Sequence, residues 1–146
     1  MKTVIVAAAC ALLSLQALAQ NTPVGLWKTI DDDGKTEKSL VRITDAGGVL
    51  SGKIEKIFDA TKQDSKCDQC TDERKDKPVL GMTLIRNVRQ NDSDKGIWDG
   101  GDILDPNNGK VYRVRLKPID GGSKLEVRGY IGTPMLGRTQ TWIRSE

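Results

Sequence analysis

Cys67 and Cys70 are the sharpest chemical feature of the sequence, because two thiols at this spacing can form a disulfide, act as a redox centre or bind a metal ion. A redox-active pair needs a helix N-terminus that stabilises the thiolate, whereas this pair follows Lys66 and is flanked by acidic residues. Zinc would need two further strong ligands, which the sequence hardly offers. In an exported protein the default is a disulfide. We therefore predict a Cys67–Cys70 clip that shapes a long loop at 59–77.

The lack of histidine removes much of the chemistry that enzymes use. The 146-residue chain contains none, which excludes His-based triads, imidazole metal ligands and imidazole acid–base catalysis. No pair of carboxylates stands out for glycoside chemistry. Two oxygen-rich runs at 31–34 and 99–109 are more typical of turns than of calcium loops, because Asp, Asn and Gly are the common turn residues. We predict a non-enzymatic protein with no metal site and no cofactor.

A few arginine and aromatic residues are candidates for a binding pocket. A planar guanidinium can grip a carboxylate or phosphate through two hydrogen bonds, so Arg128 and Arg138 beside Tyr130 form a candidate anion site. Trp98 and Trp142 are candidate pocket walls, although in a chain with so few aromatic residues both are first expected in the core. Most arginines on strands are expected on the solvated outer face.

The first nineteen residues have the pattern of an export signal. Lys2 supplies a positive charge, residues 4–15 are apolar, and Ala17-Leu18-Ala19 has the small residues that signal peptidase requires. We predict cleavage after Ala19, which leaves a single domain at 20–146 and removes the signal peptide 1–19.

The composition of residues 20–146 limits the classes of partner that we expect the protein to bind. Residues 20–146 carry 22 basic and 20 acidic residues, and this near balance gives no reason to expect nucleic acid or an anionic membrane as a partner. No segment after the signal has the length and apolar character of a membrane span. Large aliphatic residues are few, so a folded domain needs nearly all of them in one core.

Apolar residues recur at even spacings, which predicts strands rather than helices. Val41 and Ile43 show the pattern, as do Tyr112, Val114 and Leu116. Asp-Gly and Asn-Gly turns separate the runs. We predict eight strands, at 24–30, 38–44, 49–58, 79–89, 97–104, 110–118, 124–131 and 138–144. Eight antiparallel strands with short links favour an all-β meander barrel, because closure leaves no exposed edge. An immunoglobulin-like sandwich is the competing fold, but the cysteines are too close together for its inter-sheet disulfide.

The first and last predicted strands carry residues that could seal such a barrel. Gly25-Leu26-Trp27 lies on the first strand, and Arg138 and Arg144 lie on the last. This combination resembles the calycin barrels, the lipocalins and their relatives, in which a Gly-x-Trp packs beneath an arginine from the last strand. The resemblance implies that Trp27 and one arginine close one end through an indole–guanidinium contact, and either arginine fits.

Further segments are similar to an uncharacterised family of small exported bacterial proteins, numbered 2147 among the domains of unknown function. The similarity extends over nearly all of 24–144 and is clearest at 66–70, 77–81, 98–106, 109–112 and 128–132. It implies a calycin-type barrel and export to a Gram-negative periplasm, with no established activity.

Barrels of this size are either packed solid or wide enough for one small ligand. The leading hypothesis is therefore a periplasmic binding module for a small apolar or amphipathic molecule. The alternatives are a ligand-free structural or interaction protein of the cell envelope and a thiol-redox accessory protein.

Overall fold

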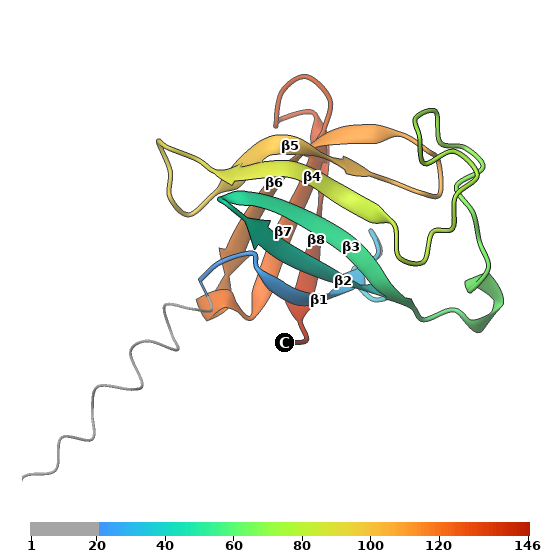
Figure 1. The fold of residues 1–146 in the computed structure, drawn as a ribbon. Helices are drawn as coiled ribbons and strands as arrows, with labels where there is room; N and C mark the ends of the chain where they lie inside the picture. The colour runs from blue at the N-terminus through green and yellow to red at the C-terminus, as the bar shows by residue number, and fades with distance from the viewer. Residues whose placement is uncertain (1–20) are drawn as a thin grey trace, which may run out of the picture.

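Eight strands close into an antiparallel barrel in the computed structural model, which describes residues 21–146 (Figure 1). The strands are β1 (Gly25–Ile30), β2 (Glu37–Ala46), β3 (Val49–Ile57), β4 (Thr83–Gln90), β5 (Trp98–Leu104), β6 (Val111–Ile119), β7 (Lys124–Tyr130) and β8 (Gly137–Arg144). Each strand pairs with the next, and β8 returns to β1 through the Trp27–Arg144 and Lys28–Ile143 pairs. The predicted eight-stranded meander barrel is confirmed. The predicted signal peptide at 1–19 lies outside the described residues.

Alternating burial along the strands produces a single core inside the barrel. On β2, Ser39, Val41 and Ile43 are buried, whereas the residues between them are partly exposed. This period of two lets each strand turn apolar side chains inward and polar side chains outward. The inward set packs around Trp27 and Trp142 as one hydrophobic cluster.

Strand β4 begins later than the sequence pattern predicts. The predicted strand at 79–89 starts at Thr83 in the structure, because the preceding residues form a turn. The Met82 backbone N–H donates to the Val79 carbonyl oxygen at 3.1 Å, and Gly81 has a φ of 85°. Val79 and Met82 of this turn are buried against the barrel, so the run of apolar residues has the composition of a strand without forming one.

The loop between β3 and β4 is held by the predicted disulfide. Cys67 and Cys70 are bonded, with their Cα atoms 5.4 Å apart, and both are buried. The Cys67 N–H donates to the Lys77 carbonyl oxygen at 2.9 Å. The loop also docks on the β5–β6 turn, where a Cβ on Gly109 would lie 2.0 Å from the Gln69 carbonyl oxygen. The disulfide therefore shapes a packed loop.

Arg74 anchors the same loop to β4, although it belongs to a charged run that reads as a solvated loop. Only 6% of Arg74 is exposed. Its Nη2 donates to Asp72 Oδ2 at 2.6 Å, and its Nη1 donates to the Thr83 carbonyl oxygen at 2.9 Å. The hydrogen bond from Arg74 lowers the pKa of Asp72 to about 2. The buried Arg74 guanidinium thus pairs with Asp72 within the loop and joins the loop to the barrel wall through Thr83.

Helical structure in residues 21–146 consists of two short 3-10 turns, η1 (Ala60–Lys62) and η2 (Asp120–Gly122). Within that range, no helix has the length and apolar character needed to cross a bilayer. Antiparallel order gathers the loops 31–36, 58–82, 105–110 and 131–136 at one end of the barrel. The start of β1, the η2 turn and the last residues of β8 meet at the other end.

Candidate functional site

Trp27 and Arg144 close one end of the barrel. Trp27 is fully buried, and the Arg144 guanidinium carbon lies 4.2 Å from the centroid of its ring. This distance is within the range of a cation–π contact. The guanidinium also donates to the carbonyl oxygens of Val24, Thr22 and Gly122, at 2.8, 2.8 and 2.6 Å. One side chain therefore ties the indole, the start of β1 and the η2 turn together. We call this the closed end.

Gly25 leaves the space that the Arg144 guanidinium occupies. A Cβ on residue 25 would lie 2.3 Å from Arg144 Nη1, and Gly25 has a φ of 142°, which other residues rarely adopt. The Trp27 Nε1 donates to the Pro23 carbonyl oxygen at 2.7 Å. Burial lowers the pKa of Arg144 below its usual value. Gly25, Trp27 and Arg144 thus form one packed unit.

Arg138 lies at the opposite end of β8 and takes no part in the seal, which corrects its place among the predicted seal residues. Its Nη1 donates to Asp32 Oδ2 at 2.8 Å, and its Nη2 donates to Asp105 Oδ2 at 2.9 Å. Its guanidinium carbon is 5.7 Å from the Tyr112 ring centroid. Burial by itself would lower the pKa of Arg138, but the carboxylates of Asp32 and Asp105 raise this pKa above its usual value. Arg138 joins two loops across what we call the open end.

A cavity of about 700 Å³ begins at the open end and extends into the barrel. Its inner part is lined by apolar side chains that include Ile54, Leu84, Val127 and Trp142. Its rim carries both acidic and basic side chains. These are Asp31, Asp32, Glu37, Lys38, Asp59, Lys62, Lys66, Asp68, Asp105 and Arg138. The cavity therefore has an apolar interior and a charged opening.

The polar groups inside the cavity are paired with one another. Thr29 Oγ1 and Ser39 Oγ lie 2.8 Å apart and share a hydrogen bond. Trp142 Nε1 donates to Gln140 Oε1 at 2.9 Å, and Gln140 Nε2 donates to Asp32 Oδ1 at 2.9 Å. An apolar molecule in the cavity would leave these groups paired, so its insertion carries no penalty for lost hydrogen bonds.

Trp142 and Arg138 line the cavity, whereas the other three predicted pocket residues do not. Val127 and Gly129 face inward on β7, and alternation places Arg128 and Tyr130 on the outside of the barrel. Arg128 Nη1 donates to Thr139 Oγ1 there, at 2.7 Å.

Trp98 is partly buried and packs against the hydrophobic core. The structure thus corrects the predictions that Arg128 and Tyr130 line an anion site and that Trp98 is a pocket wall.

Gln140 is the main cavity residue that the sequence reasoning missed. It lies two residues from Arg138 and two from Trp142, so the period of two that identifies strands also places all three on the inner face. Applying that alternation to β8 as a whole would have selected Gln140 as a site residue.

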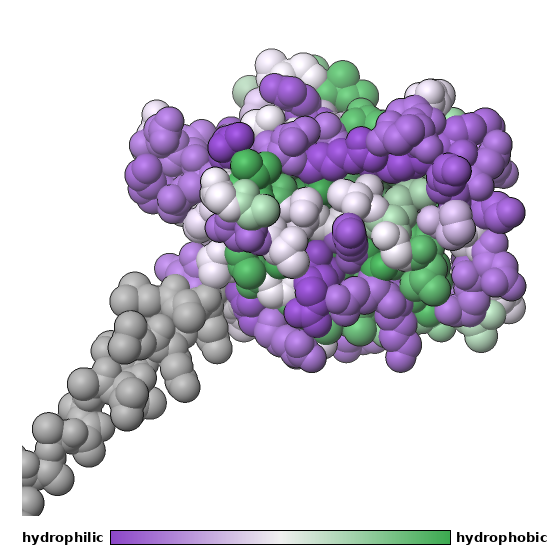
Figure 2. All heavy atoms as spheres, in the orientation of Figure 1, coloured by the Kyte–Doolittle hydropathy of each residue, from purple (hydrophilic) through white to green (hydrophobic). Residues whose placement is uncertain are grey.

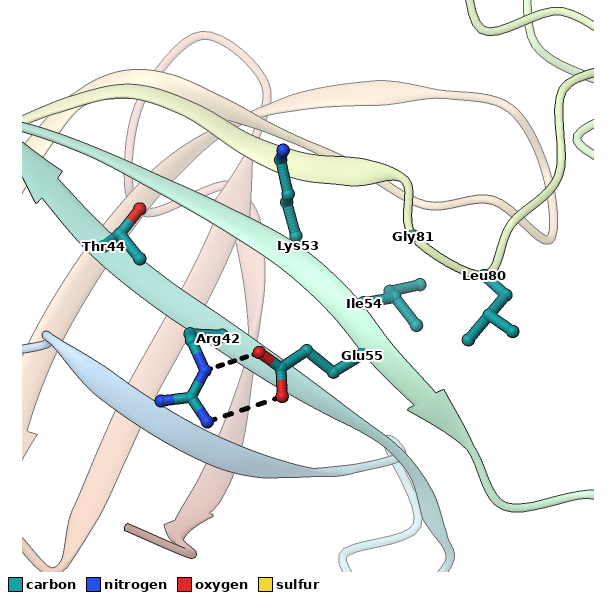
Figure 3. A pocket seen from close by; sticks show the side chains of 7 residues that line it. All are labelled: Arg42, Thr44, Lys53, Ile54, Glu55, Leu80 and Gly81. Carbon is teal, nitrogen blue, oxygen red and sulfur yellow. Dashed lines mark hydrogen bonds and ion pairs between the residues drawn. The ribbon is translucent and has the colours of Figure 1, made fainter.

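A second hollow, of about 490 Å³, lies on the outside of β2 and β3 (Figure 3). Arg42 and Glu55 point toward each other across the strand pair, and Arg42 Nε lies 2.5 Å from Glu55 Oε1. Leu80 and Ile54 supply its apolar side chains, and Ile54 borders both hollows. Because Arg42 and Glu55 are exposed and already paired, this hollow is a weaker candidate than the cavity of the barrel.

A meander barrel sealed at one end by an indole–guanidinium contact and hollow at the other defines a lipocalin-like, calycin-type protein. The structure of protein HP1028 from Helicobacter pylori, described as belonging to the lipocalin family, matches this chain with a TM-score of 0.72 at 20% identity. The match covers 86% of this chain and 84% of that one, and it shows a shared fold. The chain belongs to the family described as "Uncharacterized protein conserved in bacteria (DUF2147)", which it matches over residues 25–144. No curated protein sequence matches the chain significantly.

Proposed function

We propose that the protein is a non-enzymatic binding module of the periplasm that holds one small amphipathic molecule in the cavity of the barrel. The cavity itself carries this proposal, because about 700 Å³ is in the usual size range of small-molecule sites. The apolar body of the ligand would contact Leu84, Val127 and Trp142, and its polar group would lie at the charged rim. The closed end leaves the open end as the route into the cavity.

Export is the second part of the proposal, and it rests on residues 1–19 and on the disulfide. A disulfide is typical of oxidising compartments such as the periplasm. We expect the intact mass of the exported protein to correspond to a chain that begins at Gln20. A mass that retains residues 1–19, or a lipid on Cys10, would contradict this expectation.

The buried disulfide favours ligand binding over a thiol-redox role. Cys67 and Cys70 are 0% and 2% exposed. An attacking thiolate must reach a disulfide sulfur for exchange to occur, and burial limits that access. The pair therefore serves the loop that borders the cavity.

A cavity-filling substitution tests the proposal. Gly129 lines the cavity, and a Cβ there would lie 3.5 Å from its nearest neighbour in Tyr112, so a larger side chain can enter the space. We expect the apolar fluorophore N-phenyl-1-naphthylamine to bind the wild type. Gly129→Leu should weaken this binding by at least about tenfold, because the leucine fills the volume of several ligand carbons.

Thr141→Leu is the matched control, because Thr141 is exposed on β8 and the substitution adds a leucine outside the barrel. If circular dichroism shows that Gly129→Leu and Thr141→Leu are both folded and the two variants bind the fluorophore equally well, the fluorophore binds elsewhere and the cavity is not the site. As an independent test, we expect native mass spectrometry of protein purified from its own periplasm to detect a co-purifying small molecule. Its absence, together with a failure to bind the probe, would support the structural or interaction role instead.

A further inference from the structure

The β7–β8 hairpin exposes large apolar side chains at the open end. Ile131, Met135 and Leu136 are 64%, 88% and 72% exposed. The hairpin projects from the barrel, and Figure 2 shows apolar atoms gathered at its end above a mostly polar surface (Figures 1 and 2). Contiguous exposed apolar groups of this kind mark interaction sites. We call residues 131–136 the apolar tip.

Hydrogen bonds hold the apolar tip in this exposed form. The Ile131 N–H donates to the Leu136 carbonyl oxygen at 3.4 Å, and the Leu136 N–H donates to the Thr133 carbonyl oxygen at 3.0 Å. Arg128 Nε donates to the Pro134 carbonyl oxygen at 2.5 Å. The backbone of the tip is therefore tied both to itself and to the outer face of β7.

A surplus of positive charge adjoins the apolar tip on the outside of β6 and β7. Arg115 and Arg128 are directly opposite each other, a placement of like charges that destabilises a sheet. The Asp99 carboxylate is 3.9 Å from Arg115, and Asp102 is opposite Arg113 in register. Neither Arg113 nor Arg128 forms a salt bridge within residues 21–146. The near balance of charge over the whole chain therefore hides a local excess of arginine.

We propose that the apolar tip and these arginines dock the protein on an anionic lipid bilayer. Apolar side chains insert at the boundary between headgroups and acyl chains, and basic residues beside them attract anionic headgroups. A second copy of the chain would bring the same arginines together, so charge favours an anionic surface over self-association. The proposal stands on the tip and the arginines, and it does not depend on a ligand in the cavity.

Vesicle flotation tests this docking, with vesicles of phosphatidylcholine alone and of phosphatidylcholine mixed with phosphatidylglycerol. We expect the wild type to float with the mixed vesicles. The triple substitution Ile131→Ser, Met135→Ser and Leu136→Ser should weaken this binding by at least about tenfold, because it removes the inserted apolar side chains. Ile143→Ser is the control, because Ile143 is 43% exposed on β8 near the closed end and its loss should leave binding unchanged.

Charge is tested separately from insertion. Arg113→Gln removes an exposed charge and should weaken binding to the mixed vesicles by about fivefold, the effect of one basic charge near an anionic surface. Lys53→Gln removes a charge of the same sign on β3, far from the tip, and should have no effect. Added salt should weaken binding by the wild type.

Three results would overturn the proposal. The wild type could float with neither kind of vesicle, or the triple variant could float like the wild type. The third is a wild type that forms a dimer and binds no vesicles, with the triple variant losing the dimer. Binding of N-phenyl-1-naphthylamine should be the same in all of these variants. A failure of membrane docking is therefore distinguishable from a failure of ligand binding.

Discussion

Arg144 and Arg138 lie six residues apart on β8, yet one seals the closed end and the other borders the opening of the cavity. Arg144 packs on a buried indole and donates to backbone carbonyls of four separate residues. Arg138 is about half exposed and pairs with the carboxylates of Asp32 and Asp105. Exposed ion pairs contribute little to stability and exchange partners readily. The closed end therefore stabilises the fold, and the open end leaves its charged groups available to a ligand.

The loops at the two ends of the barrel also differ in their length and in the contacts that hold them. The η2 turn at the closed end is short and is held by Arg144. The loop at 58–82 is long, and it has its own disulfide and its own anchor in Arg74. Substitutions at the closed end should therefore unfold the barrel, whereas substitutions in this loop should act locally.

The largest expected effect comes from Trp27→Ala. The indole is fully buried, and its removal should lower the free energy of unfolding by about 3–5 kcal/mol. This is a large part of the stability of a small domain. Urea denaturation followed by circular dichroism measures the change. Arg113→Ala on the outer face is the control and should cost less than about 0.5 kcal/mol. A Trp27→Ala melt that coincides with the wild-type melt would refute the seal.

The two arginines of β8 give the most direct comparison of the ends. Arg144→Ala should cost about 2–3 kcal/mol, because it removes the cation–π contact and leaves buried carbonyl groups unpaired. Arg138→Ala should cost less than about 1 kcal/mol, because its ion pairs are exposed. Denaturant melts of both variants under the same conditions measure the difference. Equal losses in the free energy of unfolding would show that the closed end does not stabilise the fold more than the open end does.

Cys67→Ser should loosen the loop while the barrel persists. The bond closes a very short loop, so its loss should lower the free energy of unfolding by about 2 kcal/mol or less. Limited proteolysis should cut within 59–77 faster than in the wild type. Reduced wild-type protein serves as a comparison and should be cut at the same sites. Two free thiols in the protein purified without reductant, or complete unfolding of the variant, would contradict this prediction.

Acid should destabilise the loop at 58–82 at a higher pH than the pH at which it unfolds the barrel. The hydrogen bond from Arg74 lowers the pKa of Asp72 from 3.8 to about 2 in the folded protein. The folded pKa is below the unfolded one, so the stabilisation is present above pH 3.8 and is lost as the pH falls through about 2. Hydrogen exchange of loop amides between these pH values measures the change. Asp72→Asn should lose this pH dependence, and a variant that keeps it would assign the effect to another group.

The strands and the disulfide were predictable because both depend on local pattern. Alternation with a period of two predicts strands wherever it occurs, as on β2, and cysteines three residues apart can meet within one turn of chain. The start of β4 was not predictable, since a turn rather than a strand buries Val79 and Met82 before Thr83. Arg74 was missed because a charged run carries no sign that one member is buried with its partner.

The sequence by itself determined that Trp27 lies on the first strand and that two arginines lie on the last, both on the same face of β8 by alternation. Only the tertiary structure decided which arginine meets the indole. The choice depends on the register in which β8 closes onto β1, where Trp27 is opposite Arg144. That register is set by the stagger accumulated around all eight strands, a non-local property that no pair of residues encodes. The same closure of the eight strands encloses the cavity that Trp142 lines.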